Sequence, residues 1–306
     1  MLLAPYCSAD EREAELDRLA AAAGAEMVQY GQSVQGRPLR AARVPACTDG
    51  AVPRVLCAAN IHGLEYVGAQ AALRLLATLA DPASAAGALR NRAEVWVIPC
   101  LNPDGYARTW AQDGAGSVAE LRANAHGVDL NRNFPLPGGA LPSWAPGAGS
   151  STPGHATYRG PAPLSEPETV ALDALLGRGQ FHAAVSFHSF MGTFIPAHVT
   201  DPQSFADYRL LCATARAAQH RPYRRLSSRR LDVFTGELED HLHHVHRAWA
   251  LTIEVFPWWA SLRQHIRAPS VFWRFNPRGA EQWIAQDAAA ATAFLNAALD
   301  RPRPKP

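Results

Sequence analysis

The strongest constraint on the fold is a pair of short apolar runs with a helical segment between them. The runs cover residues 54–59 ("RVLCAA") and 94–99 ("EVWVIP"), and residues 65–80 between them have apolar side chains at helical spacing. Apolar runs of this length are typical of strands, and a helix between two strands suits a crossover connection. The pattern predicts a βαβ unit.

Further segments of the same kinds continue along the chain. Predicted strands cover residues 181–187 and 248–256, and predicted helices lie near residues 167–176, 204–218 and 279–299. Towards the N-terminus, a capping-box pattern and a later glycine bound a first helix, and a turn-rich hairpin follows it. The expected architecture is one mostly parallel sheet with helices on both faces.

The composition excludes several classes of protein. Of 306 residues, 48% are apolar and 18% are charged, as in a globular protein, and no apolar run approaches the roughly 20 residues of a membrane span. A formal net charge of +2 does not suggest a nucleic-acid-binding surface. We therefore expect no nucleic acid and no membrane among the partners, and the oligomeric state stays open.

Five cysteines are scattered along the chain without a CxxC arrangement, which argues against a disulfide framework or a thiolate metal site. No linker divides the sequence, so residues 1–306 are predicted to form a single domain, with residues 301–306 ("RPRPKP") as a flexible, solvated tail. The N-terminus has no basic segment and only a short apolar run. If Met1 is the true start, these features predict a cytoplasmic protein.

Residues 135–163 interrupt the regular pattern. The segment is rich in proline and glycine and is too long for an ordinary connection. A disordered insert is one interpretation. We favour a loop that walls a groove, because Trp144 and Tyr158 offer side chains that can pack.

Two potential metal ligands stand where a predicted strand ends. His62 and Glu65 follow the run at residues 54–59, and their spacing lets both side chains reach one point. A catalytic zinc takes three nitrogen or oxygen ligands and leaves a fourth position for water. Open α/β sheets bind ligands at the carboxyl ends of strands, and His188 follows another apolar run. These three residues predict a zinc site, although the His-x-x-Glu spacing alone also arises by chance in surface loops.

Other polar residues suit hydrolytic chemistry. Glu254 interrupts the run at residues 248–256, where a buried carboxylate is costly unless it is paired or functional. Asn131 and Arg132 begin a dense group of hydrogen-bond donors, and arginine suits the capture of a carboxylate. Arg122 adds a second cation nearby, although each arginine could equally lie on a solvated surface.

Seven segments, taken in chain order, resemble motifs of the M14-type zinc carboxypeptidases. The segments are "GQSVQGRPL", "NIHGLE", "NPDGY", "RANAHGVDLNRNFP", "YRGPAPLSEPET", "SFHS" and "LTIEV". Each match alone is modest, and "NPDGY" is a turn by its composition, but the shared order runs through most of the chain. The resemblance implies a three-layer α/β/α sandwich around a mixed, mostly parallel eight-stranded sheet.

The resemblance also implies which residues bind the metal. His62, Glu65 and His188 would hold one Zn²⁺ per chain, and Asp129 would orient His62 from behind. Glu254 would act as general base for the attacking water and then pass the proton to the leaving amine.

Three residues would contact the substrate in the family's arrangement. Arg122 would polarise the scissile carbonyl and stabilise the oxyanion, and Asn131 and Arg132 would hold the terminal carboxylate. The implied protein is an exopeptidase, a zinc metallopeptidase that hydrolyses the C-terminal peptide bond.

Two departures from the family bear on specificity. The tyrosine that closes over the substrate in digestive members is missing. An ungapped count places Asp232 there, with Phe234 close by, and Tyr223 is a candidate replacement. The segment "TGELEDH" resembles the family's pocket motif, but Glu237 and His241 replace its serine and tryptophan.

Glu239 falls where the family often places a residue at the base of the pocket. An acid there would favour a basic side chain or a free amino group on the substrate. A solvated turn explains Glu237 and Glu239 equally well.

The segment "HLHHVH", residues 241–246, contains four histidines. At helical spacing His241 and His244 share one face, whereas His243 and His246 point elsewhere. We interpret the segment as an exposed helix and not as a metal site.

Three functions are compatible with the sequence. The first is a metallocarboxypeptidase that prefers a basic or amine-bearing terminal residue. The second is a cytoplasmic murein-peptide amidase that cleaves between D-glutamate and diaminopimelate, which the missing tyrosine makes a serious alternative. The third is a non-catalytic peptide-binding module, whose mark would be the loss of a metal ligand or of the base, and none is missing. The expected partner is a peptide or a murein peptide as substrate.

Overall fold

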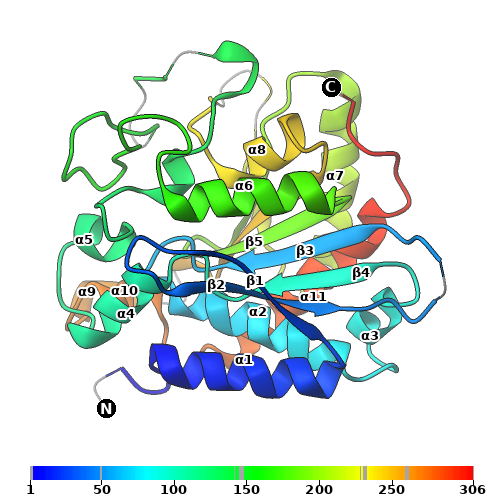
Figure 1. The fold of residues 1–306 in the computed structure, drawn as a ribbon, viewed down its shortest axis with the longest axis horizontal. Helices are drawn as coiled ribbons and strands as arrows, with labels where there is room; N and C mark the ends of the chain where they lie inside the picture. Colours follow the sequence, from blue (N-terminus) through cyan, green and yellow to red (C-terminus); the bar gives the residue numbers. More distant parts are fainter. Residues whose placement is uncertain are drawn as a thin grey trace.

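The fold is built around one mixed sheet between two layers of helices (Figure 1). The computed structural model describes residues 3–48, 50–140, 142–144, 148–227, 229, 233–258 and 262–305. The strands are β1 (Glu26–Gln32), β2 (Pro38–Val44), β3 (Arg54–Ala59), β4 (Glu94–Ile98), β5 (Ala183–Ser189), β6 (Thr193–Pro196), β7 (Arg224–Arg225) and β8 (Trp249–Val255). They lie in the order β1-β2-β4-β3-β5-β8-β6-β7, so the predicted eight-stranded α/β fold is confirmed.

The helices divide between the two faces of the sheet. They are α1 (Ala9–Ala23), α2 (Tyr66–Leu79), α3 (Ala85–Leu89), α4 (Pro103–Ala111), α5 (Val118–Arg122), α6 (Pro167–Gly179), α7 (Pro202–Ala217), α8 (Leu238–His244), α9 (Leu262–Arg267), α10 (Phe272–Phe275) and α11 (Glu281–Ala298). One apolar core joins α1, α2, α3, α7 and α11 to the sheet, and a second joins α6 and α8 to the opposite face. None of the helices in the described ranges combines the length and hydropathy that a bilayer crossing requires.

The middle of the sheet is parallel. Strands β4, β3, β5 and β8 pair in parallel, with α2 as the crossover from β3 to β4, which confirms the predicted βαβ unit. The predicted hairpin β1–β2 is antiparallel, and so are the pairs β2–β4 and β6–β8. Strands β4 and β5 are buried along their whole length, which explains their continuous apolar sequences. The carboxyl ends of β3, β5 and β8 meet at one edge of the sheet.

The segment "NPDGY" begins a helix, so its prediction as a turn is wrong. The side chain of Asn102 accepts a hydrogen bond from the Gly105 backbone N–H, and Pro103 occupies the first turn of α4. An asparagine cap followed by proline starts helices as readily as turns. The helix continues because it buries Tyr106 and Thr109 against the protein.

The long loop at residues 135–163 lines the cleft described below through Ala148. Its Tyr158 carbonyl accepts a hydrogen bond from the Asp129 N–H at 2.8 Å. Trp144 is 95% exposed, however, so the packing role predicted for this tryptophan is wrong.

The end of the chain also packs against the protein. The Trp249 indole N–H donates to the Pro302 carbonyl at 3.0 Å, and the Arg303 guanidinium donates to the His246 carbonyl. Pro304 is buried. The prediction of a solvated tail is wrong for this part of the chain.

Candidate active site

Three side chains predicted as metal ligands converge at the carboxyl edge of the sheet. His62 and Glu65 lie in the turn between β3 and α2, and His188 lies near the end of β5. His62 Nδ1 is 2.9 Å from Glu65 Oε1 and 3.2 Å from His188 Nδ1. His188 Nδ1 is 3.3 Å from Glu65 Oε2, and all three residues are buried. We refer to these residues as the active-site cluster.

The active-site cluster fits a zinc ion. Asp129 Oδ1 lies 3.2 Å from His62 Nε2, which assigns the proton to this nitrogen and leaves the Nδ1 lone pair facing the cluster. That lone pair faces a carboxylate oxygen and a second ring nitrogen, and a cation between these atoms satisfies all three. Two imidazole nitrogens and one carboxylate oxygen form a donor set typical of catalytic zinc. Burial alone would raise the pKa of Glu65, but His62 and His188 lower it to about 2.

The turn that carries the ligands depends on a close backbone contact. A Cβ atom at Gly63 would lie 2.4 Å from the Gly105 backbone, so no larger residue fits without a shift. The Gly63 N–H donates to the Arg122 carbonyl at 3.1 Å. Asn60 adopts a left-handed conformation with φ 55°, which asparagine tolerates well, and its amide donates to the His62 carbonyl.

Two of the sequence motifs support this turn and do not line the cleft. The Asp104 carboxylate, in "NPDGY", accepts hydrogen bonds from the Ser33 hydroxyl, the Gln35 N–H and the Arg37 guanidinium at 2.8, 2.9 and 2.6 Å. Ser33, Gln35 and Arg37 all belong to the motif "GQSVQGRPL". The contacts hold the β1–β2 hairpin to the start of α4, whose next residue, Gly105, supports the ligand turn from behind.

Glu254 lies beside the active-site cluster. It lies on β8 and is paired in register with His188 on the neighbouring parallel strand β5. Within the described residues, its Oε2 atom is buried without a hydrogen-bond partner. Burial and the nearby Glu65 carboxylate raise the pKa of Glu254 to about 8. A buried carboxylate with a raised pKa beside a metal cluster suits a general base.

Arg122 points from the end of α5 towards the same cluster. Its Nε donates to Asp129 Oδ2 at 2.8 Å, and its Nη1 lies 4.0 Å from Glu65 Oε1. Burial would raise the pKa of Asp129, but the charge of Arg122 and then that of His62 hold it well below its usual range. Asp129 therefore fixes both a ligand histidine and a guanidinium, in agreement with its predicted contact with His62.

Asn131 and Arg132 lie on the wall of the same cleft. Asn131 Oδ1 accepts the Leu238 N–H at 2.9 Å, so its amide NH₂ is the group that can donate to a substrate. Arg132 Nη1 forms an ion pair of 2.9 Å with Glu237 Oε1. The predicted carboxylate anchor is thus already next to a carboxylate of the chain itself.

Asn133, the third member of this polar group, has a different task. It is fully buried, and its amide donates to the carbonyls of Arg159 and Ala162 and to the Ser165 hydroxyl. It therefore holds the segment "YRGPAPLSEPET" in place and does not line the cleft.

One cleft of about 450 Å³ unites the predicted site residues. The active-site cluster, Glu254, Arg122, Asn131 and Arg132 line it together. Glu237 and Glu239 line it as well. Glu239 is 3% exposed, which excludes a solvated turn as the explanation for this residue.

Comparison with known proteins agrees with this geometry. A family model described as "Zinc carboxypeptidase" (peptidase M14) matches residues 13–261. The chain belongs to the zinc carboxypeptidase family. Members of this family are zinc-dependent hydrolases, so zinc is the metal that the active-site cluster is expected to hold.

Individual relatives of this chain extend the comparison. A metallocarboxypeptidase A-like protein from Trichophyton verrucosum is 29% identical over 178 residues, which cover 56% of this chain and 40% of that protein. Carboxypeptidase A2 from Rattus norvegicus is 31% identical over 204 residues, covering 60% and 45%. The chain thus spans less than half the length of these relatives. The crystal structure of thrombin activatable fibrinolysis inhibitor shares the fold, with a TM-score of 0.80 at 19% identity over 97% of this chain and 75% of that one.

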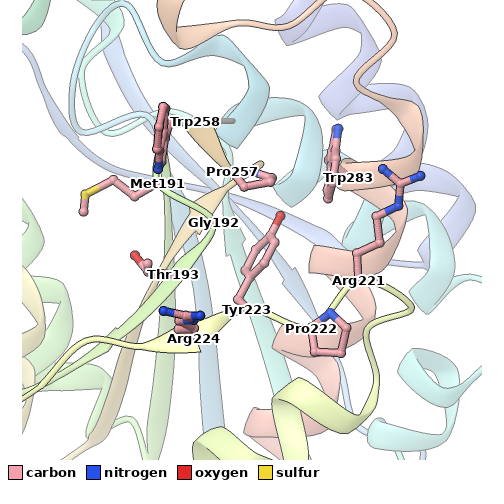
Figure 2. A pocket seen from close by; sticks show the side chains of 10 residues that line it. All are labelled: Met191, Gly192, Thr193, Arg221, Pro222, Tyr223, Arg224, Pro257, Trp258 and Trp283. Atoms are coloured by element: carbon pink, nitrogen blue, oxygen red, sulfur yellow. The ribbon is translucent and has the colours of Figure 1, made fainter. Parts of the chain in front are cut away.

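Tyr223 does not replace the tyrosine that closes over the substrate in digestive members of the family. The Tyr223 hydroxyl donates to Asp287 Oδ2 at 2.8 Å and accepts the Phe256 N–H at 2.9 Å. Figure 2 shows this tyrosine among the residues that line a separate cavity of about 690 Å³. Phe234 packs against two histidine rings, and Asp232 lies outside the described residues.

The histidine-rich segment is not an exposed helix, so that prediction is wrong. His241 and His243 are 1% and 3% exposed. Helix α8 ends at His244, and the chain then turns, which brings His246 back to His241. Their Nε2 atoms lie 3.2 Å apart. The predicted helical faces fail because they assume that the helix continues.

The sequence pattern gave no signal for Asn276, which positions the ligand turn from the C-terminal part of the chain. Its Oδ1 accepts the Val67 N–H at 3.0 Å, and its amide donates to the carbonyls of Leu64 and Phe272 at 2.7 and 2.9 Å. These contacts lie on both sides of Glu65. A single asparagine beyond the motifs offers no periodicity or spacing from which this role could be inferred.

Proposed function

We propose that this protein is a zinc-dependent carboxypeptidase that releases a basic or amine-bearing residue from the C-terminus of peptides. The observation that carries the proposal is the meeting of five parts in one cleft: the active-site cluster, a carboxylate, two guanidinium groups and a buried acid. Each part matches one requirement of terminal peptide-bond hydrolysis.

The chain's residues divide the catalytic tasks between them. Zinc bound by the active-site cluster would supply Lewis-acid chemistry for a water molecule and for the scissile carbonyl. Glu254 would remove a proton from the water and deliver it to the nitrogen of the leaving amine. Arg122, held in place by Asp129, would donate hydrogen bonds to the developing oxyanion.

The terminal carboxylate of the substrate would bind Arg132 and the Asn131 amide. Arg132 is already paired with Glu237, whose side chain is 24% exposed and can move into solvent. Substrate binding would then exchange one carboxylate for another at the same guanidinium. This exchange would weaken substrate binding, because the existing ion pair must be loosened.

Glu239 supports a preference for a positively charged terminal residue. Its side chain is buried in the cleft, and within the described residues its Oε2 atom has no hydrogen-bond partner. Burial, together with the charges of Glu237 and Asp240, raises the pKa of Glu239 well above its usual range. A substrate ammonium or guanidinium group would supply both the missing donor and the missing charge.

A murein-peptide amidase remains the second candidate. Diaminopimelate carries an amine that would suit Glu239 and a carboxylate that would suit Arg132. No tyrosine lines the cleft in the described part of the chain, which favours a substrate other than those of the digestive members.

One experiment separates these functions. The zinc-loaded protein is incubated with peptides that differ only in the last residue (lysine, arginine, leucine, phenylalanine or aspartate), each with a free or an amidated C-terminus, and with a murein tripeptide. The released amino acid is then identified. Release of lysine and arginine from free but not amidated C-termini supports the proposal. Release of diaminopimelate alone supports the amidase. A zinc-loaded protein that binds these peptides but releases nothing would be the non-catalytic binding module.

A further inference from the structure

A second group of metal-binding side chains lies away from the active site, between α6 and α8. Asp173 belongs to α6, His241 to α8, and His246 to the turn that leads into β8. Asp173 Oδ1 lies 2.7 Å from His241 Nε2 and 2.8 Å from His246 Nε2. The two Nε2 atoms are 3.2 Å apart. We refer to these three residues as the helix cluster.

The separations in the helix cluster match a metal site. Zinc–nitrogen bonds of about 2.0–2.1 Å at tetrahedral angles place two ligand nitrogens about 3.3 Å apart. The helix cluster and the active-site cluster are the groups of three metal donors found within the described ranges. The donor set is again two imidazole nitrogens and one carboxylate oxygen, which suits zinc and similar divalent ions.

The protein holds these donors in position through other contacts. The His241 ring stacks on Phe134 with ring centroids 4.9 Å apart and an angle of 28° between the planes. The His246 backbone carbonyl accepts a hydrogen bond from Arg303, which fixes the turn after α8. The geometry therefore requires little rearrangement for an ion to bind.

The cluster is open to solvent on one side. The side chains of His241 and His246 are 2% and 10% exposed, whereas that of Asp173 is 33% exposed. An ion can enter past the carboxylate, and water can supply its fourth ligand. Because the two imidazoles are buried, other ligands cannot readily reach the ion from the side of the histidines.

We propose that Asp173, His241 and His246 bind a second divalent transition-metal ion of the zinc type, which ties α8 to α6. The first turn of α8 carries Glu239 of the cleft, and the Leu238 N–H binds the Asn131 side chain. An ion bound to His241, in the middle of this short helix, and to His246, in the turn that follows it, would fix the substrate pocket without contacting substrate. Binding of this second ion requires neither the catalytic zinc nor the proposed activity.

The test is the zinc stoichiometry of the full chain, measured by equilibrium dialysis with Zn²⁺ as the only added metal. Wild type is expected to bind two equivalents, and Asp173→Asn and His246→Gln one each. His244→Gln is the matched control on the same helix, because His244 bonds to the His198 carbonyl outside the cluster. This control is expected to retain both equivalents.

Activity and optical spectra keep the result interpretable. Asp173→Asn and His246→Gln should keep the single ion that supports turnover, and Co²⁺-loaded wild type should show one set of visible absorption bands that both variants lack. A wild type that binds one equivalent, which His188→Ala abolishes, would overturn the proposal and leave Asp173 as a hydrogen-bond acceptor for two histidines. Retention of two equivalents by both cluster variants would also overturn it.

Discussion

The two donor clusters have the same chemistry but different surroundings. In each, two imidazole nitrogens lie 3.2 Å apart, and each nitrogen lies 2.7–3.3 Å from an oxygen of one carboxylate. The active-site cluster lies at strand ends and is buried. It shares one cleft with Arg122 and Glu254, and Asp129 contacts His62 from behind. The helix cluster joins two helices and has a partly exposed carboxylate. Ligand geometry alone therefore does not make a catalytic site, because a base and an oxyanion donor must face the same ion.

The largest expected effect follows the loss of one metal ligand from the active-site cluster, which should leave the helix cluster unchanged. His188→Ala should abolish detectable turnover and remove one zinc equivalent, because the metal loses one of three ligands. The ion at the helix cluster should remain. Zinc content and peptide hydrolysis of the same samples measure both effects, with Asp173→Asn as the reciprocal control. Turnover in His188→Ala with wild-type zinc content would show that the catalytic metal lies elsewhere.

The next largest effect concerns Glu239, the buried acid that lines the active-site cleft. Glu239→Gln should lower kcat/KM for a peptide ending in lysine by about ten- to a hundredfold, the size of a lost hydrogen bond between charged groups. A peptide ending in leucine should be hydrolysed equally well or better. An equal loss of kcat/KM for both peptides would mean that Glu239 supports the fold and does not bind the terminal side chain of the substrate.

The carboxylate of Asp287 is buried, and no cation of the described residues is among the groups that shift its pKa, so it should behave differently from Glu65. Burial raises the pKa of Asp287 to about 8, although Tyr223 and Gln219 donate to it. The folded protein therefore keeps a proton that the unfolded chain loses above about pH 4, so the contribution of Asp287 to the free energy of unfolding falls as pH rises from about 4 to 8. Asp287→Asn should remove this fall, by at most about 1.4 kcal/mol per pH unit. Urea midpoints of both proteins across this range test it, and parallel curves would refute the assignment.

The smallest expected effect concerns the ion pair at the substrate anchor. Glu237→Gln should lower KM for peptides by about two- to fivefold, because a partly exposed ion pair contributes roughly 0.2–1 kcal/mol and would no longer compete for Arg132. The value of kcat should change little. A rise in KM instead would indicate that Glu237 orients Arg132 for binding.

Much of the active site could be predicted because its residues follow apolar strands at fixed points. The apolar runs identified β3, β5 and β8, and the polar residues at their ends include His62, His188 and Glu254. Arg122, Asn131 and Arg132 follow no strand, and their substrate-binding roles were expected from the resemblance to the zinc carboxypeptidases.

Other features depend on contacts that no local pattern encodes. His246 meets His241 only because α8 stops at His244 and the chain turns back. Asn276 reaches the ligand turn across more than 200 residues of sequence. Trp144 suggested packing by its size, yet its side chain remains exposed. In each case the outcome is decided by where an element ends or by a distant partner.

Glu254 is proposed to act as the general base beside a metal held by the active-site cluster. The most direct test compares Glu254→Gln with wild type for zinc content and for turnover of one peptide ending in lysine. We expect unchanged zinc content and a kcat lowered by about 10²–10⁴-fold, because the variant cannot accept the proton from water. Unchanged zinc content with a kcat within a few fold of wild type would contradict it.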